Sequence, residues 1–480
     1  KEYNSSNSKK ENIKSRLSLI SSVLGILEDK TFNEISEEFK NEIQNKSLEP
    51  VLIEKDLCIV ALVGDKMKSK KGISGKLFSS LGNNNINVRA IAQGASERNI
   101  SIIIDETNAK KALNALHESF FEKDLKDIHI FITGVGNVGG YLIQQIKDQK
   151  DFISENLGLN LKILGISNSK KMLISKKEID LKNWSGLLND SNAKADKDIF
   201  QKTIIELNRR NSLFVDNTAS EIIPLTYKDY LKNGVGIITC NKISNSGTLS
   251  LYKELRELSR GHNTPFYYET NVGAALPVIS TLKNLINSGD KVLKIEAVLS
   301  GTLNYIFNNF QEENTFHDIV SNAVELGYTE PDPKIDLCGI DVCRKILILA
   351  RESGFNLEYE DVKKNHFLPD ESINTNSKDE FVLSLKNNKA HFNKILSEAK
   401  EKNCRLKFVA KLENGHASVG LEAISADHPF YNLVGSDNIT VFYTERYKDS
   451  PLVVKGAGAG GEFTASGVFA DIIKASQENG

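Results

Sequence analysis

The sequence predicts a multidomain protein of mixed α/β and α+β class. Its 480 residues exceed what one hydrophobic core organises, so about two to four domains are expected. Residues 52–121 alternate in the order β-α-β-β-α, which is typical of a ferredoxin-like unit. Residues 127–245 alternate strand and helix in the manner of a parallel sheet. Farther on, Arg405–Leu412 and Ala417–Ile424 flank the turn dipeptide Asn414-Gly415, which predicts an antiparallel hairpin with Asn438–Thr444 as its neighbour.

The first predicted unit alternates apolar strands with amphipathic helices. The expected elements are strands at Cys58–Gly64, Ile86–Gly94 and Ile100–Asp105 and helices at Gly72–Leu81 and Ala109–Phe121. Upstream, an apolar run near Leu17–Leu27 and a helix at Phe32–Ile43 favour the trailing half of a second such unit. Nothing in residues 1–121 supplies a nucleophile or an acid/base pair, so this region is predicted to bind or pack rather than to catalyse.

Composition and charge restrict the class of partner. The formal net charge of −2 predicts no nucleic-acid partner, and no apolar run approaches the roughly 18 residues of a membrane span. The N-terminus is polar and lacks the apolar core of a signal peptide. The cysteines at 58, 240, 338, 343 and 404 form no CxxC pair, so reduced thiols and a cytoplasmic location are expected. The first residue is not Met, which is expected of a fragment of a longer polypeptide.

Residues 128–140, IHIFITGVGNVGG, contain the pattern GxGxxG at Gly134, Gly136 and Gly139. An apolar strand precedes the pattern and a helix follows it, which is the context that a dinucleotide-binding turn requires. The glycines allow a tight turn, close approach of a pyrophosphate and close helix–strand packing. The helix N-terminus adds free N–H groups and the positive end of the helix dipole. A glycine-rich loop without a ligand is the alternative.

The next strand, LKILGIS, ends without the acidic residue that would bind the ribose 2′-hydroxyl of NAD. It ends instead in Ser167, Asn168, Ser169, Lys170 and Lys171, which suit a 2′-phosphate better. The sequence therefore favours NADP(H), with NAD(H) as the alternative. Solvated surface charges would explain the two lysines without a ligand.

Two further strands deliver polar residues to the edge where open α/β sheets bind ligands. The segment LFVDNTAS ends with Asp216, Asn217 and Thr218, and IITCNK ends with Asn241 and Lys242. A lysine at this edge would approach the nicotinamide ribose or a substrate. The alternative for Lys242 is a salt bridge within a loop.

The segment GYTEPDPKIDLCGIDVCRK, from Gly327 to Lys345, is the richest in chemistry. It leads into a predicted helix that runs from about Asp336 to Gly354 and is apolar on almost its whole circumference. A helix of this kind is buried. Asp341 and Lys345 nevertheless lie on it four residues apart, so their side chains meet on one face. Buried charges are costly unless they are paired or used.

The residues alone leave two interpretations of these charges open. A structural ion pair, with Asp336 as the helix N-cap, explains Asp341 and Lys345. Glu330 and Asp332, held by the prolines that follow each of them, favour a polar pocket instead.

These segments resemble homoserine dehydrogenase, specifically the C-terminal part of the bifunctional aspartokinase–homoserine dehydrogenases. Residues 52–121, with GISGKLF and AIAQGASERNIS, are similar to the second regulatory ACT domain of those enzymes, and residues before 50 to the tail of the first. The kinase domain has no counterpart, so kinase activity is not expected. The matching motifs stand in the family's order and cover nearly all of residues 127–480: GVGNVGG at 134–140, CNKISNSG at 240–247, ETNVGAALPV at 269–278, LSGTLNYIF at 299–307, GYTEPDPKIDLCGIDVCRK at 327–345 and GAGAGGEFTASGVFADII at 456–473.

The resemblance implies an ACT-like regulatory region at 1–121, a Rossmann domain at 122–268 with 455–480, and a mixed α/β catalytic and dimerisation domain at 269–454. The implied reaction is the reversible, NAD(P)H-dependent reduction of L-aspartate 4-semialdehyde to L-homoserine, in the biosynthesis of threonine, methionine and isoleucine. A homodimer or higher homo-oligomer is also implied. Feedback by threonine, with Gln93 as a contact, would be weakened or absent because the first ACT-like unit is incomplete.

The resemblance also implies roles for individual residues. Glu330 and Asp341 would hold the substrate, Lys345 would donate and accept the proton, and Asp336 would be a second catalytic acidic residue. A monovalent cation, sodium or potassium, would be bound through a carboxylate and nearby carbonyls at Glu269, Val272, Ala274 and Leu276, and relatives often have Asp at the first of these positions. The dinucleotide would contact Gly134, Gly136, Asn137, Val138, Gly139, Asn168, Lys170, Thr218, Lys242, Gly327 and Gly458.

Aldehyde reduction needs a hydride and a proton for the developing alkoxide. The Lys345 ammonium, or a water that it orients, would supply the proton and stabilise the oxyanion. A free lysine has a pKa near ~10.4; adjacent carboxylates raise it and burial lowers it. The surrounding carboxylates would pair with the α-ammonium of an amino-acid substrate.

Two other functions stay open at this level. Aspartate-semialdehyde dehydrogenase would need a cysteine nucleophile, and Cys240, Cys338 and Cys343 lie in suitable regions, although the last two also fit as small core residues. A non-catalytic sensor, in which an ACT-like domain is fused to a dinucleotide-binding fold, would be inert toward NADPH and the aldehyde.

Overall fold

The computed structural model describes residues 34, 36–49, 54–64, 67, 71–93, 99–121 and 125–478. The chain divides into two compact units. The first comprises residues up to Lys126 together with Asn208–Arg210, and the second comprises Asp127–Leu207 together with Asn211–Gly480. The apolar run predicted at Leu17–Leu27 lies outside the described residues. The helix predicted just after it is represented by α3, Lys40–Gln44.

The first unit has the predicted β-α-β-β-α order. Its antiparallel sheet has the strand order β1-β3-β2. Every second residue of β3 is buried, because one face of the sheet packs against the helices. The second strand begins later than predicted. The elements are β1 (Leu57–Val63), α4 (Ile73–Gly82), β2 (Ala90–Gln93), β3 (Asn99–Asp105) and α5 (Ala109–Phe121).

The second unit begins with a six-stranded sheet of order β6-β5-β4-β7-β8-β9. The pairs β4–β7, β7–β8 and β8–β9 are parallel, and β6 is an antiparallel edge. The last six residues of β4 are all buried, as expected when helices cover both faces of a parallel sheet. The strands are β4 (Lys126–Thr133), β5 (Leu159–Ser167), β6 (Met172–Ile174), β7 (Ser212–Asp216), β8 (Gly236–Thr239) and β9 (Phe266–Tyr267).

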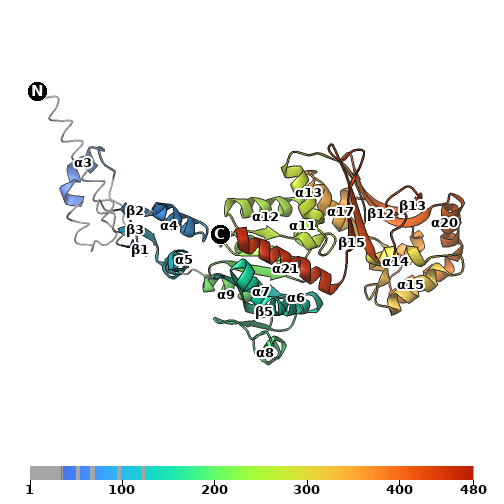
Figure 1. Cartoon of the computed structure of the whole chain (residues 1–480), viewed down its shortest axis with the longest axis horizontal. Helices are drawn as coiled ribbons and strands as arrows, with labels where there is room; N and C mark the ends of the chain where they lie inside the picture. Colours follow the sequence, from blue (N-terminus) through green and yellow to red (C-terminus); the bar gives the residue numbers. More distant parts are fainter. Residues whose placement is uncertain are drawn as a thin grey trace, which may run out of the picture. The chain divides into compact units, whose positions relative to one another are not determined.

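The C-terminal helix α21, Gly461–Glu478, returns to this first part of the second unit and lies beside α6, Asn137–Asp148 (Figure 1). Gln145 on α6 donates a hydrogen bond of 2.9 Å to Ser466 on α21. The other helices around this sheet are α7 (Lys150–Leu157), α8 (Trp184–Asp190), α9 (Lys197–Leu207), α10 (Tyr227–Lys232), α11 (Ile243–Ser246) and α12 (Leu249–Gly261).

A second six-stranded sheet has the order β11-β13-β12-β10-β14-β15. The predicted hairpin is present, and Asn414 and Gly415 at its turn both have positive φ. The prediction that Asn438–Thr444 lies next to this hairpin was wrong, because β10 lies between the hairpin and β14. The strands are β10 (Val292–Val298), β11 (Lys363–Asn365), β12 (Arg405–Glu413), β13 (His416–Ile424), β14 (Asp437–Thr444) and β15 (Leu452–Ala457).

Helices pack on this second sheet and shape the space beside it. Figure 1 shows α14 close to strand β12, and these two elements are in contact. The helices are α13 (Val278–Asn287), α14 (Gly301–Asn309), α15 (Phe316–Glu325), α16 (Pro333–Leu337), α17 (Ile340–Glu352), α18 (Asp370–Ile373), α19 (Lys378–Asn387) and α20 (Lys389–Glu401).

The predicted helix from Asp336 to Gly354 is divided into α16 and α17. Gly339 separates them with a φ of 69°, and a Cβ there would lie 2.6 Å from the Phe408 ring. The N-cap prediction was also wrong, because Asp332 caps α16 by accepting a hydrogen bond from the Lys334 N–H. The prediction that this helix is buried is confirmed for α17.

Within the described residues, no helix is both long and apolar enough to cross a membrane.

Candidate active site

The three glycines of the phosphate-binding turn have three different surroundings. Gly134 has a φ of 89°, and a Cβ there would lie 2.8 Å from backbone and side-chain atoms of Asn217 and Thr218. A Cβ on Gly139 would lie 2.3 Å from the Gly134 carbonyl oxygen. A Cβ on Gly136 would meet no atom within 4 Å. The first and third glycines are therefore needed for packing, and the middle one leaves open space for a ligand.

The open space lies at the N-terminus of α6, whose N-cap is Gly136. The first N–H groups of a helix have no partner in the helix, so this end attracts a pyrophosphate. Beside it, both polar side-chain atoms of Asn217 are buried and lack a hydrogen-bond partner among the described residues. The turn thus fits a dinucleotide.

The other predicted cofactor residues surround this turn. Asn137 lies against α21, because a Cβ on Gly461 would be 2.7 Å from its side chain, and Val138 packs partly into the core. Asn438 on β14 donates a hydrogen bond of 3.3 Å to the Gly458 carbonyl. The glycine-rich segment before α21 therefore contacts β14 through Gly458 and the start of α6 through Gly461.

The turn after β5 is held by Asn168. Its side-chain oxygen accepts hydrogen bonds from the backbone N–H groups of Lys170, at 2.8 Å, and Lys171, at 2.7 Å. The Lys171 ammonium donates to the Asn189 carbonyl, whereas the Lys170 side chain is exposed. Lys170 is therefore the cation of this turn that remains available to a ligand.

Asp216 organises the carboxyl ends of β7 and β8. It is fully buried and accepts hydrogen bonds from the Tyr227 hydroxyl (2.6 Å), the Asn241 side chain (3.2 Å) and the Thr218 N–H (2.8 Å). Burial raises the pKa of Asp216, although these hydrogen bonds oppose the shift. The carboxylate fixes the loops that carry Thr218 and Lys242, a positioning role that residue type alone did not reveal.

Asp341 lies between two lysines from different parts of the second unit. Its carboxylate is 2.8 Å from the Lys345 Nζ and 3.2 Å from the Lys242 Nζ. Lys345 is 7% exposed and donates a further hydrogen bond of 2.6 Å to the Leu299 carbonyl. The predicted pair of Asp341 and Lys345 is therefore present. Lys242, at the end of β8, joins it and connects the dinucleotide-binding sheet with the buried helix.

The surroundings of Lys242, Asp341 and Lys345 shift the pKa values of the two lysines in opposite directions. Burial lowers the pKa of Lys345, and the neighbouring Asp341 opposes that shift. Asp341 chiefly raises the pKa of Lys242, so Lys242 stays protonated. Burial alone would raise the pKa of Asp341, but the two lysines outweigh it and hold the pKa below its usual range. Lys345 is thus the cation that most readily releases a proton.

Asp336 adds a carboxylate near Lys345, and Glu330 lies beside Asp336. The Asp336 side chain accepts a hydrogen bond of 2.8 Å from the Glu330 N–H. Burial, with smaller contributions from the charges of Glu330 and Asp341, raises the pKa of Asp336 to about 6. The Glu330 side chain is exposed, as is Gly327, which ends α15 with a φ of 72°. Three carboxylates near two lysines fit a ligand that itself carries an ammonium group.

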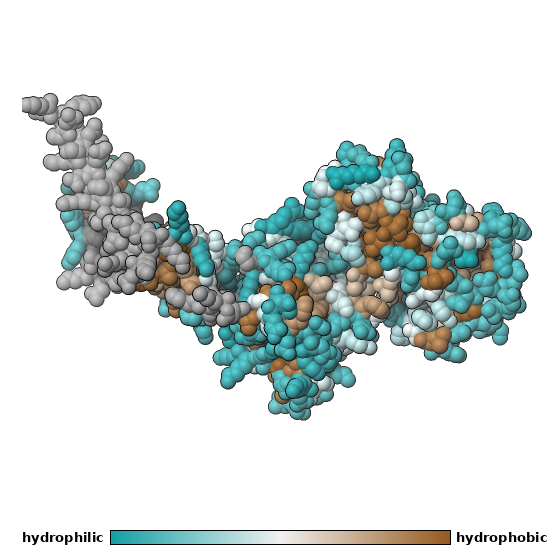
Figure 2. All heavy atoms as spheres, viewed as in Figure 1, coloured by the Kyte–Doolittle hydropathy of each residue, from teal (hydrophilic) through white to brown (hydrophobic). Residues whose placement is uncertain are grey.

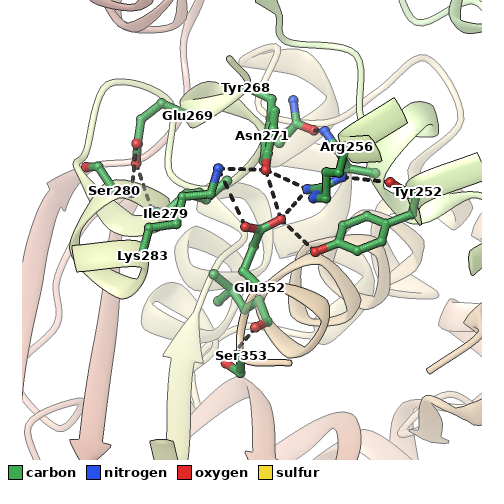
Figure 3. Close-up of polar contacts among 12 residues, drawn as sticks. Tyr252, Arg256, Tyr268, Glu269, Asn271, Ile279, Ser280, Lys283, Glu352 and Ser353 are labelled. Carbon is green, nitrogen blue, oxygen red and sulfur yellow. Dashed lines mark hydrogen bonds and ion pairs between the residues drawn. The ribbon is translucent and has the colours of Figure 1, made fainter. Parts of the chain in front are cut away.

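The predicted cation residues form the loop before α13. The Glu269 carboxylate accepts hydrogen bonds from the N–H groups of Ile279, at 2.7 Å, and Ser280, at 2.8 Å, so it caps α13 (Figure 3). Gly273 and Ala274 both have positive φ, which turns the chain sharply here. Within the described ranges, no group of three or more His, Cys, Asp or Glu side chains is placed to bind a metal. The other predicted ligands are the backbone carbonyls of Val272, Ala274 and Leu276, and the last of these already accepts a hydrogen bond of 2.8 Å from the Val278 N–H.

The cysteines do not suit a nucleophile. Burial raises the pKa of Cys240 to about 12 and that of Cys343 to about 11. The pKa of Cys338 is also raised by burial. A thiol reacts as its thiolate, so these three side chains are poorly activated at neutral pH. The geometry therefore disfavours a thioester mechanism.

A dinucleotide-binding sheet that adjoins a cluster of lysines and carboxylates is the arrangement typical of nicotinamide-dependent oxidoreductases. Residues 277–473 match the homoserine dehydrogenase family, residues 134–269 the homoserine dehydrogenase NAD binding domain, and residues 60–120 an ACT domain. The homoserine dehydrogenase of Schizosaccharomyces pombe is 37% identical over 358 residues, which are 72% of this chain and 95% of that enzyme. The chain belongs to the homoserine dehydrogenase family.

Larger relatives and solved structures agree with this assignment. The bifunctional aspartokinase/homoserine dehydrogenase 2 of Arabidopsis thaliana is 41% identical over 460 residues, which are 94% of this chain and 50% of that protein. The chain therefore spans about half the length of this relative and does not cover its aspartokinase portion. A Candida auris protein of unknown function superposes with a TM-score of 0.68 at 33% identity, over 73% of this chain and 99% of that one. A hyperthermophilic archaeal homoserine dehydrogenase mutant in complex with NADPH superposes with a TM-score of 0.56 at 26% identity, over 73% and 98% of the chains.

Proposed function

We propose that this chain catalyses the reversible reduction of L-aspartate 4-semialdehyde to L-homoserine with a nicotinamide dinucleotide. The observation that carries the proposal is the Lys242–Asp341–Lys345 triad at the carboxyl edge of the dinucleotide-binding sheet. It lies where a hydride donor and an amino-acid aldehyde would meet. The dinucleotide supplies or accepts the hydride when bound.

Substrate recognition is assigned to carboxylates. Asp341 is ionised and half-exposed, and Glu330 is exposed beside Asp336. The α-ammonium of the substrate would donate charge-assisted hydrogen bonds to these carboxylates. At Asp341 it would take the place of part of the contact with the two lysines. The same arrangement disfavours a substrate that carries only negative charge.

Proton transfer is assigned to Lys345. In the reducing direction its ammonium, or a water that it orients, gives a proton to the alkoxide that forms as the aldehyde accepts the hydride. Because burial lowers the pKa of Lys345, it releases this proton more readily than a solvated lysine does. In the reverse direction neutral Lys345 takes the proton from the alcohol.

The test is a steady-state assay with NADPH and aspartate semialdehyde. The change Lys345→Ala should lower kcat by about 10²–10⁴-fold, because a general acid contributes roughly that much, while NADPH binding by fluorescence stays unchanged. The matched control is Lys386→Ala, an exposed lysine on α19. Retained turnover in the Lys345 variant would refute the assignment, and inactivity of the unaltered chain would refute the proposed reaction.

NADP(H) is proposed as the preferred cofactor because Lys170 is exposed next to Asn168 at the end of β5, with no acidic residue among the turn residues. The archaeal relative in complex with NADPH is consistent with this choice. The change Lys170→Ala should raise the KM for NADPH and leave the KM for NADH unchanged.

A monovalent cation, sodium or potassium, is proposed at the loop of Val272, Ala274 and Leu276. The support is the sharp turn with two consecutive positive φ values next to the Glu269 carboxylate, because carboxylate and carbonyl oxygens are the ligand types that hard cations prefer. Replacing potassium and sodium chloride by a salt of a bulky organic cation should lower the melting temperature of the chain.

Threonine is proposed as an effector of the ACT domain. Gln93 lines a cleft of about 210 Å³ together with the residues at the N-terminus of α4. An amide at a helix N-terminus suits the carboxylate of an amino acid. Threonine should inhibit turnover, and Gln93→Ala should weaken that inhibition; equal inhibition of both proteins would remove Gln93 from the site.

A homodimer is proposed through the second sheet. Figure 2 shows a hydrophobic patch over its strands, and this sheet exposes 40% of Leu293 and 45% of Val453. Exposed apolar patches of this kind mark interaction surfaces. Val453→Lys should shift the mass measured by light scattering toward the monomer.

A further inference from the structure

A second cleft lies at the other end of helix α17 from the catalytic triad. It has a volume of about 480 Å³ and is lined by α12, β9, α13 and the last residue of α17. Cavities of this size accommodate small metabolites. The side chains that matter here are Tyr252, Arg256, Arg260, Tyr268, Lys283 and Glu352.

Glu352 is the centre of the cleft and is already saturated. Its carboxylate is only 4% exposed and pairs with Arg256 and with Lys283, at 3.6 Å (Figure 3). The hydroxyls of Tyr252 and Tyr268 each donate a further hydrogen bond of 3.0 Å to it. These partners satisfy the carboxylate, so it has little capacity left to bind a ligand.

The cleft contains more positive than negative charge. Among the residues that line it, Arg256, Lys283 and Arg260 are cations and Glu352 is the one carboxylate. Glu269 and Asp471, which do not line the cleft, also attract Lys283. Burial lowers the pKa of Lys283 even though the charges of Glu352, Glu269 and Asp471 oppose the shift.

The three cations differ in how many contacts they already make within the protein. Arg256 donates to Tyr268 and Glu352, and its guanidinium lies 3.4 Å from the centroid of the Tyr252 ring. Lys283 donates one hydrogen bond of 2.7 Å to Tyr268 but remains 37% exposed. Arg260 is exposed and has no ion pair within the described part of the chain. Lys283 and Arg260 are thus the donors that a ligand can reach.

We infer that this cleft binds a small organic anion through a phosphate or carboxylate group held by Lys283 and Arg260, with the tyrosine rings as its wall. Arginine and lysine are the residues that recognise such groups. The inference goes beyond the proposed dehydrogenase activity and does not depend on it. Because the cleft joins α12, which follows β8, with α13 and α17, an occupant would stabilise contacts between the dinucleotide-binding part and the catalytic helix.

The test measures binding of inorganic phosphate and of succinate by calorimetry. The chain is saturated with NADPH, so that the phosphate-binding turn is occupied, and the carboxylates around Lys345 disfavour binding of either anion at the catalytic site. Saturable binding of either probe is expected, and the stronger probe distinguishes a phosphate site from a carboxylate site. Chloride at equal ionic strength is the reference.

Arg260→Gln and Lys283→Gln should each weaken this binding about tenfold or more, because each removes a hydrogen bond to a charged group. Lys253→Gln, on the exposed side of the same helix α12, should bind like the unaltered chain. Arg260 lies at the rim, so its variant remains informative even where Lys283→Gln perturbs folding. Absence of saturable binding by both probes, or equal binding by Arg260→Gln and Lys253→Gln, would overturn the inference.

Discussion

Helix α17 carries a carboxylate between two cations at each of its ends, and the two arrangements differ in one decisive respect. Asp341 lies between Lys242 and Lys345, and its side chain is 50% exposed. Glu352 lies between Arg256 and Lys283 and is 4% exposed. Similar charge patterns on one helix therefore leave Asp341 accessible to a ligand at the first end, whereas at the second end Glu352 is buried and holds neighbouring elements together.

The difference follows from the number of donors around each carboxylate. Glu352 accepts from two tyrosine hydroxyls in addition to its cations, so its lone pairs are used. The contacts of Asp341 among the described residues are the two lysines. A carboxylate with unused lone pairs and access to solvent can bind a charged substrate, whereas a saturated one holds elements together.

The largest effect on stability is expected from Glu352→Gln. This change leaves Arg256 and Lys283 without their buried counter-charge, so the free energy of unfolding should fall by about 3–5 kcal/mol. Urea unfolding followed by circular dichroism measures it. Turnover per folded molecule should persist, since Glu352 does not contact the Lys242–Asp341–Lys345 triad. A Glu352→Gln variant that is stable but inactive would contradict the view that Glu352 serves stability and Asp341 serves substrate binding.

Asp341→Asn should give the opposite pattern. Lys345 loses its nearest counter-charge, but the loss of stability should be smaller than for Glu352→Gln because the Asp341 carboxylate is half-exposed and solvent screens its interactions. The change also removes a charged partner of the proposed substrate ammonium. We expect kcat/KM to fall by about 10–100-fold, as for a lost hydrogen bond to a charged group. Steady-state kinetics and urea unfolding together decide the matter, and a large loss of stability with normal kcat/KM would contradict the assignment.

Gly339→Ala should disturb the junction between α16 and the Asp341 end of α17. A methyl group would meet the Phe408 ring at 2.6 Å, and the φ of 69° disfavours any residue with a Cβ. The free energy of unfolding should fall by about 1–3 kcal/mol. Gly261→Ala, at the end of α12 with no atom within 4 Å of the added carbon, is the matched control. Equal stability of the two variants would show that α16 and α17 can adjust without cost.

The smallest effect is a pH dependence that only the catalytic end should show. Burial raises the pKa of Asp336 to about 6, so this carboxyl is charged above that pH and neutral below it. As the pH falls through 6 the site loses a negative charge that would face the substrate's α-ammonium, and the KM for this zwitterionic substrate should rise, by about tenfold per unit well below the pKa. Asp336→Asn should flatten this limb of the KM profile. An unchanged profile would assign the titration to another group.

The local features of the chain were predictable from its sequence. A continuous apolar run predicts strand β4, and the spacing of the glycines that follow predicts a phosphate-binding turn and the start of α6. Both signals are properties of a few neighbouring residues. The hairpin at Asn414-Gly415 and the pairing of Asp341 with Lys345 are equally local, because a turn dipeptide and a four-residue spacing determine them.

Tertiary contacts decided the rest. The break at Gly339 depends on the Phe408 ring, and the place of β14 depends on β10, neither of which a local pattern contains. Lys242 joins Asp341 from a distant segment, and this contact converts a possible structural pair into a site at the sheet edge. The Glu352 cluster had no sequence signal, because α12, β9, α13 and α17 each contribute to it. Spacing along the chain thus determined which side chains share a helix face or a turn, whereas burial and the partners brought by folding determined which charges remain available for chemistry.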